Sequence, residues 1–171
     1  MMPAPPALYL PRALRNPAPE QQRDAMRHLA SQAAWADLAW PQFLEHLMAL
    51  GRADVPLARL AEGHIDALRI LSQADTAPKP GSLYGVWASR SGGTGLTATA
   101  TDGGWHLTGR LLFASGAGVL DRALVTAWPG PETHVLLDAP VADWEFDSSH
   151  WRTRAMEHSR SHRVHLDRRV E

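Results

Sequence analysis

Two groups of residues have types and spacings that suggest ligand chemistry. Ser91–Gly95 (SGGTG) is as rich in glycine as a phosphate-binding loop. It lacks the Lys-Ser/Thr pair of a P-loop, and no helical pattern follows it, so we predict a flexible loop. His158, His162 and His165 are potential metal ligands. Because His162 and His165 would point to opposite faces of a strand, we predict no metal site.

The arginines near the C-terminal end raise the question of nucleic-acid binding. Six of them lie between Arg152 and Arg169, and they alternate with apolar residues as on a solvated strand face. The net charge is only −1, and the aromatic platform of single-strand binders is absent. No Gly-x-Ser-x-Gly elbow frames a nucleophile either. We therefore predict no nucleic-acid partner and no hydrolase activity.

The most informative stretch is Gly103–Ala127, GGWHLTGRLLFASGAGVLDRALVTA. It has the pattern of a hairpin arm, an apolar strand that ends in Phe113-Ala114-Ser115-Gly116, a short loop and a second apolar strand. On that strand, Leu107, Leu111 and Phe113 fall on one face by period two. Taken alone, Phe113 and Ser115 are typical of a core aromatic followed by a serine at a strand end.

The first half of the chain has the period of helices. Residues 20–39 contain neither Gly nor Pro and are rich in good helix formers, which predicts a first helix. A second helix is expected from Pro41 to Gly51, because Pro suits a helix start and Gly a helix end. Asp54 is a suitable N-cap for a third helix over residues 56–72. The segment Gln73–Gly81 has the composition of a linker.

The second half changes to period two, which predicts short strands. Asp102-Gly103 lies between two such runs and predicts a tight hairpin turn. Helices that precede strands favour an α+β fold, in which a short N-terminal helical layer is followed by a mostly antiparallel β-barrel-like domain. The expected strands are Leu83–Trp87, Thr97–Thr101, the run around Leu107–Ala114, Ala123–Trp128, His134–Ala139, Trp144–Phe146 and Arg163–Asp167.

Composition is typical of a globular protein: 171 residues, 44% apolar and 20% charged, without cysteine. No apolar run approaches the roughly 20 residues that span a bilayer. The Pro-rich start does not resemble a signal peptide, so we expect a cytoplasmic protein without a membrane span. We divide the chain into a Pro-rich segment (1–19), a helical domain (20–78) and a β-domain (79–171).

These patterns together resemble the acyl-CoA dehydrogenase family. In its central β-domain, a strand ends in an aromatic–x–Ser/Thr–x–Gly pattern like that of Phe113–Gly116. The helix Leu57–Leu71 contains the Gly-His-x-x-Ala pattern of one branch, and Tyr84–Trp87 matches a strand that contacts the flavin. The tail from Trp151 to Asp167 is similar to the W-x-x-x-G-M-R-x-T-x-S-x-x-V-x-h-D segment of the family.

The resemblance implies a flavoprotein of fatty-acid metabolism that removes hydrogen from the α and β carbons of an acyl-CoA thioester. Its cofactor would be FAD, and its electrons would go to a carrier flavoprotein. The residues that would contact the flavin are Val86, Trp87, Phe113, Ala114 and Ser115. In particular, the Phe113 ring would pack on the isoalloxazine, and Ser115 or the neighbouring backbone N–H groups would bond its N5/O4 region.

The sequence also departs from the family. Phe113 replaces the commoner Trp, and Arg154–Glu157 lacks the usual Gly before Met and the Arg after it. The family's C-terminal helical bundle, which carries the catalytic base, is not found in these residues. We therefore expect weak or no FAD binding by this chain, and a homo-oligomer or a complementary helical chain. Two alternatives remain, a non-catalytic module that binds a partner and a flavin monooxygenase relative on the same fold.

Overall fold

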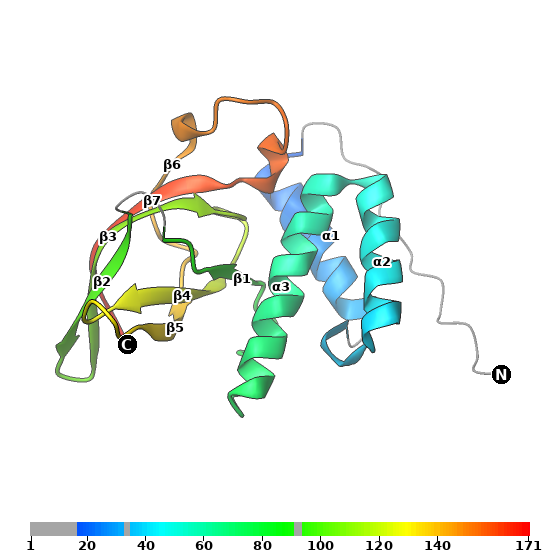
Figure 1. Ribbon diagram of the computed structural model, residues 1–171. Helices are drawn as coiled ribbons and strands as arrows, with labels where there is room; N and C mark the ends of the chain where they lie inside the picture. The colour runs from blue at the N-terminus through cyan, green and yellow to red at the C-terminus, as the bar shows by residue number, and fades with distance from the viewer. Residues whose placement is uncertain (1–16, 33–34, 91–93) are drawn as a thin grey trace.

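The computed structural model describes residues 17–32, 35–90 and 94–171. It has two parts, a group of three helices and a curled sheet, and α3 lies between the sheet and the other two helices (Figure 1). After position 82 the described residues form only strands and short 3-10 turns. The expected α+β class, with helices first and a mostly antiparallel curled sheet second, is confirmed.

The helices are α1 (Pro19–Gln32), α2 (Trp40–Ala53) and α3 (Val55–Gln73), and the 3-10 turn η1 (Trp35–Asp37) lies between the first two. The prediction of one helix over 20–39 is wrong, because the indole of Trp35 turns into the core instead of extending α1. That ring is 5% exposed and packs edge-on against His46. By contrast, Asp54 caps α3 as expected, since its carboxylate accepts the backbone N–H of Leu57 at 2.9 Å.

Seven strands form one sheet in the order β1-β4-β2-β3-β7-β6, with β5 paired to the other side of β4. The pairs β1–β4 and β2–β4 are parallel, and the remaining pairs are antiparallel. Six of the seven expected strands are observed, and residues 102–103 form the β2–β3 turn. The strand expected at Trp144–Phe146 is displaced to Phe146–Asp147, because the backbone N–H of Trp144 closes a turn on the Val141 carbonyl at 3.1 Å. The observed strands are β1 (Tyr84–Trp87), β2 (Gly95–Thr101), β3 (Gly104–Ala114), β4 (Arg122–Trp128), β5 (Val135–Pro140), β6 (Phe146–Asp147) and β7 (His162–Val170).

A break in pairing near the end of β3 changes the side to which Phe113 points. The β3–β7 register shifts between Leu111 and Ala114, as at a β-bulge. Leu107, Leu111 and Ala114 are consequently buried, whereas Phe113 is 48% exposed. The expectation that Phe113 shares the face of Leu107 and Leu111 is therefore wrong, because the alternation of side chains does not continue through the bulge.

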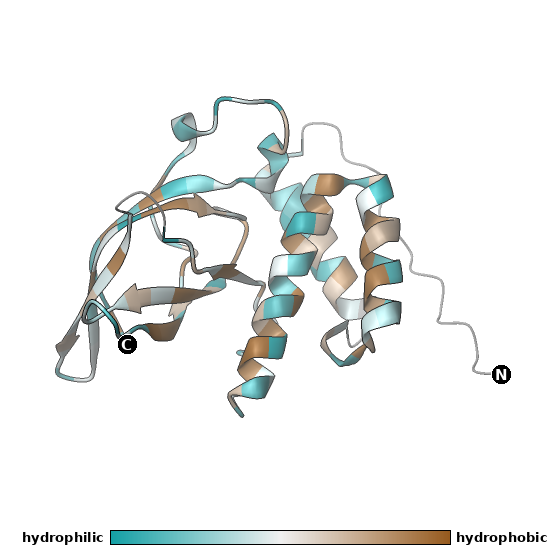
Figure 2. Ribbon diagram, viewed as in Figure 1, coloured by the Kyte–Doolittle hydropathy of each residue, from teal (hydrophilic) through white to brown (hydrophobic). Residues whose placement is uncertain are grey.

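One hydrophobic core joins the helices to the sheet. It includes Met26 of α1, Leu57 and Ile65 of α3, and Leu107 and Val125 of the sheet. Figure 2 shows hydrophobic and hydrophilic residues alternating around α2 and α3, as expected for helices buried on one face. Nowhere in the described ranges is a helix long and apolar enough to cross a membrane.

A polar contact also ties α1 to the start of the sheet. The Asp121 carboxylate accepts the guanidinium of Arg23 at 2.8 Å and the backbone N–H of Leu83 at 2.8 Å. Asp121 lies directly before β4, and Leu83 lies directly before β1. The contact therefore fixes the beginnings of these two parallel strands relative to α1.

Candidate functional site

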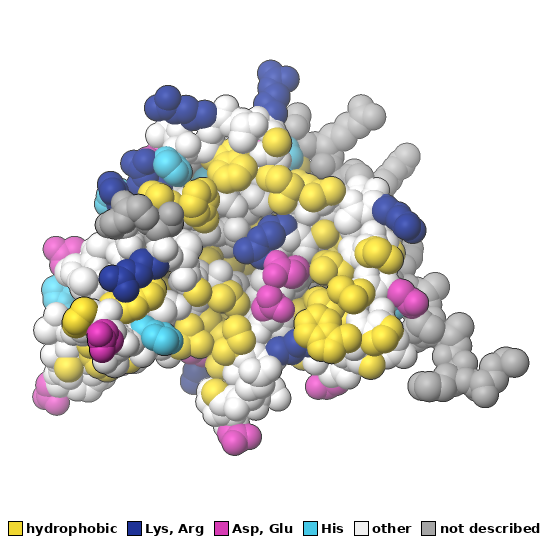
Figure 3. Space-filling model, viewed as in Figure 1, with side chains coloured by type: hydrophobic (Ala, Val, Ile, Leu, Met, Phe, Trp, Pro, Cys, Tyr) yellow, Lys and Arg dark blue, Asp and Glu magenta, His cyan; other side chains and the backbone are white. Residues whose placement is uncertain are grey.

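A cleft of about 470 Å³ lies between α3 and the edge of the sheet where β1 and β3 end. The third wall is the segment between β6 and β7. In Figure 3, basic and acidic side chains gather over α3 in the hollow between the sheet and the helices. The lining residues are Arg59, Glu62, Gly63, Asp66, Val86, Ala88, Ser89, Phe113, Ser115, Trp151, Met156, Ser159 and Ser161.

Three of the five residues expected to contact a flavin line this cleft, namely Val86, Phe113 and Ser115. The structure thus brings together residues of two strands that are not adjacent in the sheet. Trp87 and Ala114 do not line it, because they are 3% and 0% exposed and pack into the core. The indole N–H of Trp87 donates to the carbonyl oxygen of Ser115 at 2.9 Å, so Trp87 fixes the backbone at the end of β3.

Serine hydroxyls form a continuous chain at one wall of the cleft. Ser115 Oγ lies 2.8 Å from Ser161 Oγ, which in turn lies 2.9 Å from Ser159 Oγ. Ser159 and Ser161 are buried, so their hydroxyls can satisfy one another without water. The backbone N–H of Gly116 donates to the Ser159 carbonyl at 2.9 Å, which holds the two segments together. A chain of this kind can donate one further hydrogen bond into the cleft from Ser115.

The segment before β7 has an unusual backbone that α1 supports. Met156 and Arg160 have φ values of 58° and 49°, a region that residues other than glycine rarely adopt. The Arg160 guanidinium donates to Gln22 of α1 and to the Pro17 carbonyl, and Gln22 donates to the His158 carbonyl. Gln22 is only 2% exposed. The surrounding structure thus holds this segment in a conformation that places Met156 in the cleft.

The wall that α3 provides is charged. Arg59 pairs with Glu62, and Glu62 also shares a hydrogen bond with Asp66. Burial raises the pKa of Glu62, the hydrogen bond to Asp66 raises it further, and the charge of Arg59 opposes both effects. The cleft therefore has aromatic and hydroxyl groups on its sheet side and a carboxyl group that can carry a proton on its helix side.

The sequence alone did not identify the α3 wall. Arg59, Glu62, Gly63 and Asp66 recur at helical spacing and form the polar face of α3. That pattern is also typical of a solvated helix face, so it could not show that a cleft lies there. Ser159 and Ser161 lie in the Trp151–Asp167 segment that was singled out only by the family resemblance. Nothing in the sequence indicated that their hydroxyls reach Ser115.

The described residues contain no group of three or more His, Asp or Glu side chains that could hold a metal ion. His162 is buried and His165, three residues further along β7, is exposed, so these two side chains point to opposite faces of the strand. For the glycine-rich Ser91–Gly95 stretch, residues 91–93 lie outside the described residues.

No family model and no curated protein matches the sequence. Solved structures do match the fold. XiaF from a Streptomyces species, in complex with FADH2 and glycerol, is 18% identical with a TM-score of 0.64, over 88% of this chain and 41% of XiaF. FMN-bound TdsC from Paenibacillus sp. A11-2 is 20% identical with a TM-score of 0.63, over 87% of this chain and 44% of TdsC. The 3-HSA hydroxylase from Rhodococcus sp. RHA1 is 17% identical with a TM-score of 0.63, over 87% of this chain and 45% of the hydroxylase.

The chain shares its fold with these structures, and also with the methanesulfinate monooxygenase MsuC and the monooxygenase HsaA. It spans less than half the length of XiaF, TdsC and the hydroxylase. The identification with the acyl-CoA dehydrogenase family is wrong, because the matching structures are monooxygenases and hydroxylases. The motifs that suggested it, a hairpin and a strand end with an aromatic and a serine, specify the fold and not the reaction.

Four expectations that depended on the dehydrogenase identity are also wrong. They are the acyl-CoA substrate, the α,β-dehydrogenation, the carrier flavoprotein and the role in fatty-acid metabolism. The expectation of FAD in particular was too narrow, because the structural neighbours contain FMN as well as FADH2.

Proposed function

We propose that this chain belongs to a flavin-dependent monooxygenase and that the cleft between α3 and the ends of β1 and β3 forms one side of its flavin site. The observation that carries the proposal is the arrangement of Phe113, Ser115 and Val86 around one cleft. The shared fold of the monooxygenases MsuC and HsaA supports it.

The residues of the cleft fit the two chemical halves of a flavin ring system, which has an apolar dimethylbenzene end and a polar pyrimidine end. Phe113 and Val86 supply apolar surface, and Phe113 is one of the few large apolar side chains that stay about half exposed. The Ser115–Ser161–Ser159 chain supplies a hydroxyl donor for a ring nitrogen or carbonyl oxygen. Covering the Phe113 ring would also remove apolar area from water.

A reduced flavin supplies the redox chemistry: it provides two electrons as O2 is split, so that one oxygen atom enters the substrate and the other leaves as water. We propose that a separate reductase delivers this flavin in its reduced form, because the neighbouring structure XiaF holds FADH2. FMN and FAD both remain candidates, since FMN and FADH2 each occur in a neighbour.

The chain itself would orient the flavin ring and would hold and release a proton beside it. Phe113 would stack on the ring, and the Ser115 hydroxyl would fix its polar edge. On the opposite wall, burial raises the pKa of the Glu62 carboxyl group above its usual range, which favours its protonated form and makes it the candidate proton donor or acceptor of the cleft. Arg59 pairs with Glu62 and stabilises the carboxylate once that proton has left.

Replacement of Phe113 tests this proposal. Reduced FMN is mixed with oxygenated buffer and the purified protein, and the return of oxidised flavin is followed at its visible absorbance band. Because the cleft is only one side of the site and binding is expected to be weak, the protein is used in large excess over FMN. It should then delay that return relative to free FMN, because a monooxygenase must suppress the unproductive reaction with O2. Phe113→Ala should lose the delay and weaken FMN binding about tenfold.

Leu136→Ala is the matched control, because Leu136 of β5 is 45% exposed and lies away from the cleft. It should behave as the wild-type protein. A wild-type protein that binds neither FMN nor FAD, in the oxidised or the reduced form, would refute the flavin site. Flavin binding without any delay of the reaction with O2 would refute the monooxygenase assignment alone.

A further inference from the structure

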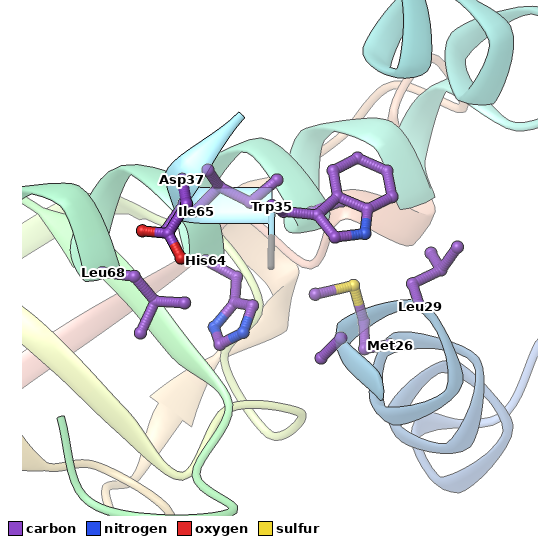
Figure 4. Close-up of a pocket in the computed structure, with 10 residues that line it drawn as sticks. Met26, Leu29, Trp35, Asp37, His64, Ile65 and Leu68 are labelled. Carbon is purple, nitrogen blue, oxygen red and sulfur yellow. The ribbon is translucent and has the colours of Figure 1, made fainter. Parts of the chain in front are cut away.

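A second cavity lies on the other face of α3. It has a volume of about 260 Å³, is lined by α1, η1 and α3 and is open to the surface on one side (Figure 4). Met26 and Leu29 of α1 face Ile65 and Leu68 of α3 across it. The residues of α3 that line the flavin cleft are different ones, at positions 59, 62, 63 and 66, so the two sites are on opposite sides of the helix.

The cavity is large for a packing defect. Protein interiors are close-packed and contain few voids larger than a water molecule. An engineered apolar cavity of about 150 Å³ is already sufficient to bind benzene. The volume here has room for a two-ring aromatic molecule, and the walls are mostly apolar. The exceptions in the wall are His64, Trp35 and Asp37.

Two N–H donors belong to this wall. His64 Nδ1 accepts the backbone N–H of Tyr84 at 3.1 Å, and burial lowers the pKa of His64 to about 4. The ring is therefore neutral near pH 7 and carries its proton on Nε2, which makes that atom a donor. The indole nitrogen of Trp35 is buried and has no acceptor within the part of the chain that the structure describes. A ligand with an apolar body and an acceptor atom would satisfy these groups.

The mouth of the cavity is positively charged. An adjoining cleft of about 410 Å³ shares the lining residues Ala30, His64 and Leu68 with the cavity. Arg27 and Lys79 line this cleft, and no acidic residue is among its described lining. Among the described residues, the carboxylate paired with Arg27 is that of Asp121 at 4.0 Å, and the Arg27 side chain is about half exposed. An anionic group at this position would interact favourably with both cations.

We propose that the cavity and its mouth together bind a small aromatic carboxylate. The aromatic body would occupy the space between Met26, Ile65 and Leu68, and the carboxylate would lie at the mouth near Arg27 and Lys79. The assignment is independent of the flavin cleft. Because α3 separates the two sites, a molecule bound here would not touch a flavin bound against Phe113 and Ser115.

The site is tested by calorimetric titration of the purified protein with 2-naphthoate. Saturable one-to-one binding is expected. Ala30 is exposed and lines both the cavity and its mouth, so Ala30→Trp should block entry without disturbing the core and should weaken 2-naphthoate binding at least tenfold. Ala142→Trp, at an exposed turn after β5, is the matched control and should bind as the wild-type protein does.

The carboxylate is tested by comparison with 2-naphthol, which is neutral at pH 7. Lys79→Gln and Arg27→Gln should each weaken 2-naphthoate binding about threefold or more and leave 2-naphthol binding unchanged, since exposed charge pairs are individually weak. Added salt should weaken the binding of 2-naphthoate and leave the binding of 2-naphthol unchanged. Equal effects on the two probes would overturn the assignment of the ligand class.

Three other outcomes would overturn the site itself. They are the absence of saturable 2-naphthoate binding, equal binding by wild type and Ala30→Trp, and displacement of 2-naphthoate by FMN. The last result would place the probe in the flavin cleft. Ala30→Trp should retain the FMN affinity of the wild-type protein, so failure of this site and failure of the proposed flavin site give different results.

Discussion

At the scale of single residues, His64 connects the helices to the sheet. It lies in the middle of α3 and accepts the backbone N–H of Tyr84 at the start of β1, and its ring stacks on that of Tyr84. The hydrogen bond requires an unprotonated Nδ1, and burial disfavours the charged ring, which lowers the pKa to about 4. Protonation of this one residue therefore competes with the packing of α3 on β1.

The lowered pKa of His64 predicts how stability depends on pH. In the unfolded chain His64 takes up a proton near pH 6.5, whereas in the folded protein it does so only near pH 4. Protons thus favour the unfolded state across this window, and the free energy of unfolding should fall by about 3 kcal/mol between pH 7.5 and 4 from this group. Urea unfolding at a series of pH values measures the fall.

His64→Gln is the comparison variant, because the amide oxygen of Gln can accept the Tyr84 N–H and does not titrate. His162, whose pKa is also lowered by burial, contributes a fall of the same sign in both proteins. Between pH 7.5 and 4, the free energy of unfolding of the variant should therefore fall by about 3 kcal/mol less than that of the wild-type protein. Parallel curves for the two proteins would show that His64 is not the group that titrates.

At the scale of elements, the end of β3 determines the shape of the cleft. Gly109 has a φ of 130°, and a Cβ at this position would lie 2.3 Å from the Gly95 carbonyl oxygen of β2. Beyond it, the register shift between Leu111 and Ala114 turns Phe113 out of the core. The Gly116 turn then returns the chain toward Ser159. These backbone irregularities, rather than side-chain packing, present Phe113 and Ser115 to the cleft.

Replacing Gly109 with Ala should therefore be strongly destabilising. The new Cβ meets backbone atoms that cannot move without breaking the β2–β3 pairing, and the φ value itself is strained for Ala. We expect a loss of about 3 kcal/mol or more in the free energy of unfolding. Gly130→Ala is the control, because no atom lies within 4 Å of its Cβ position, and it should change stability by less than about 0.5 kcal/mol. Similar losses in both variants would contradict this account of β3.

The same irregularities explain which parts of the structure the sequence predicts. Local signals were sufficient for α3, because Asp54 caps it and its apolar residues recur at helical spacing, and for the hairpin at Asp102-Gly103. The end of α1 and the bulge in β3 depend on long-range packing of Trp35 and on pairing with β7, which no local pattern shows. Phe113 and Ser115 were named as candidates, whereas the charged wall of α3 appeared only once the helix was placed against the sheet.

At the scale of the whole molecule, α3 separates two sites of different chemistry. Its polar face, with Arg59, Glu62 and Asp66, forms a wall of the cleft assigned to the flavin. Its opposite face, with His64 and Leu68, lines the cavity assigned to an aromatic carboxylate. The position of α3 relative to the sheet sets the width of the cleft, and its position relative to α1 sets the width of the cavity.

The most direct test of the central claim is to map FMN on the protein by NMR. Oxidised FMN is titrated into the isotope-labelled protein, and backbone amide signals are followed. We predict that the largest shifts occur at Val86, Ser115 and Gly116, with little change at Leu136 of β5 or at Met26 beside the second cavity. Shifts centred on Met26 and Ile65, or no saturable shift at Val86, Ser115 and Gly116, would contradict this prediction.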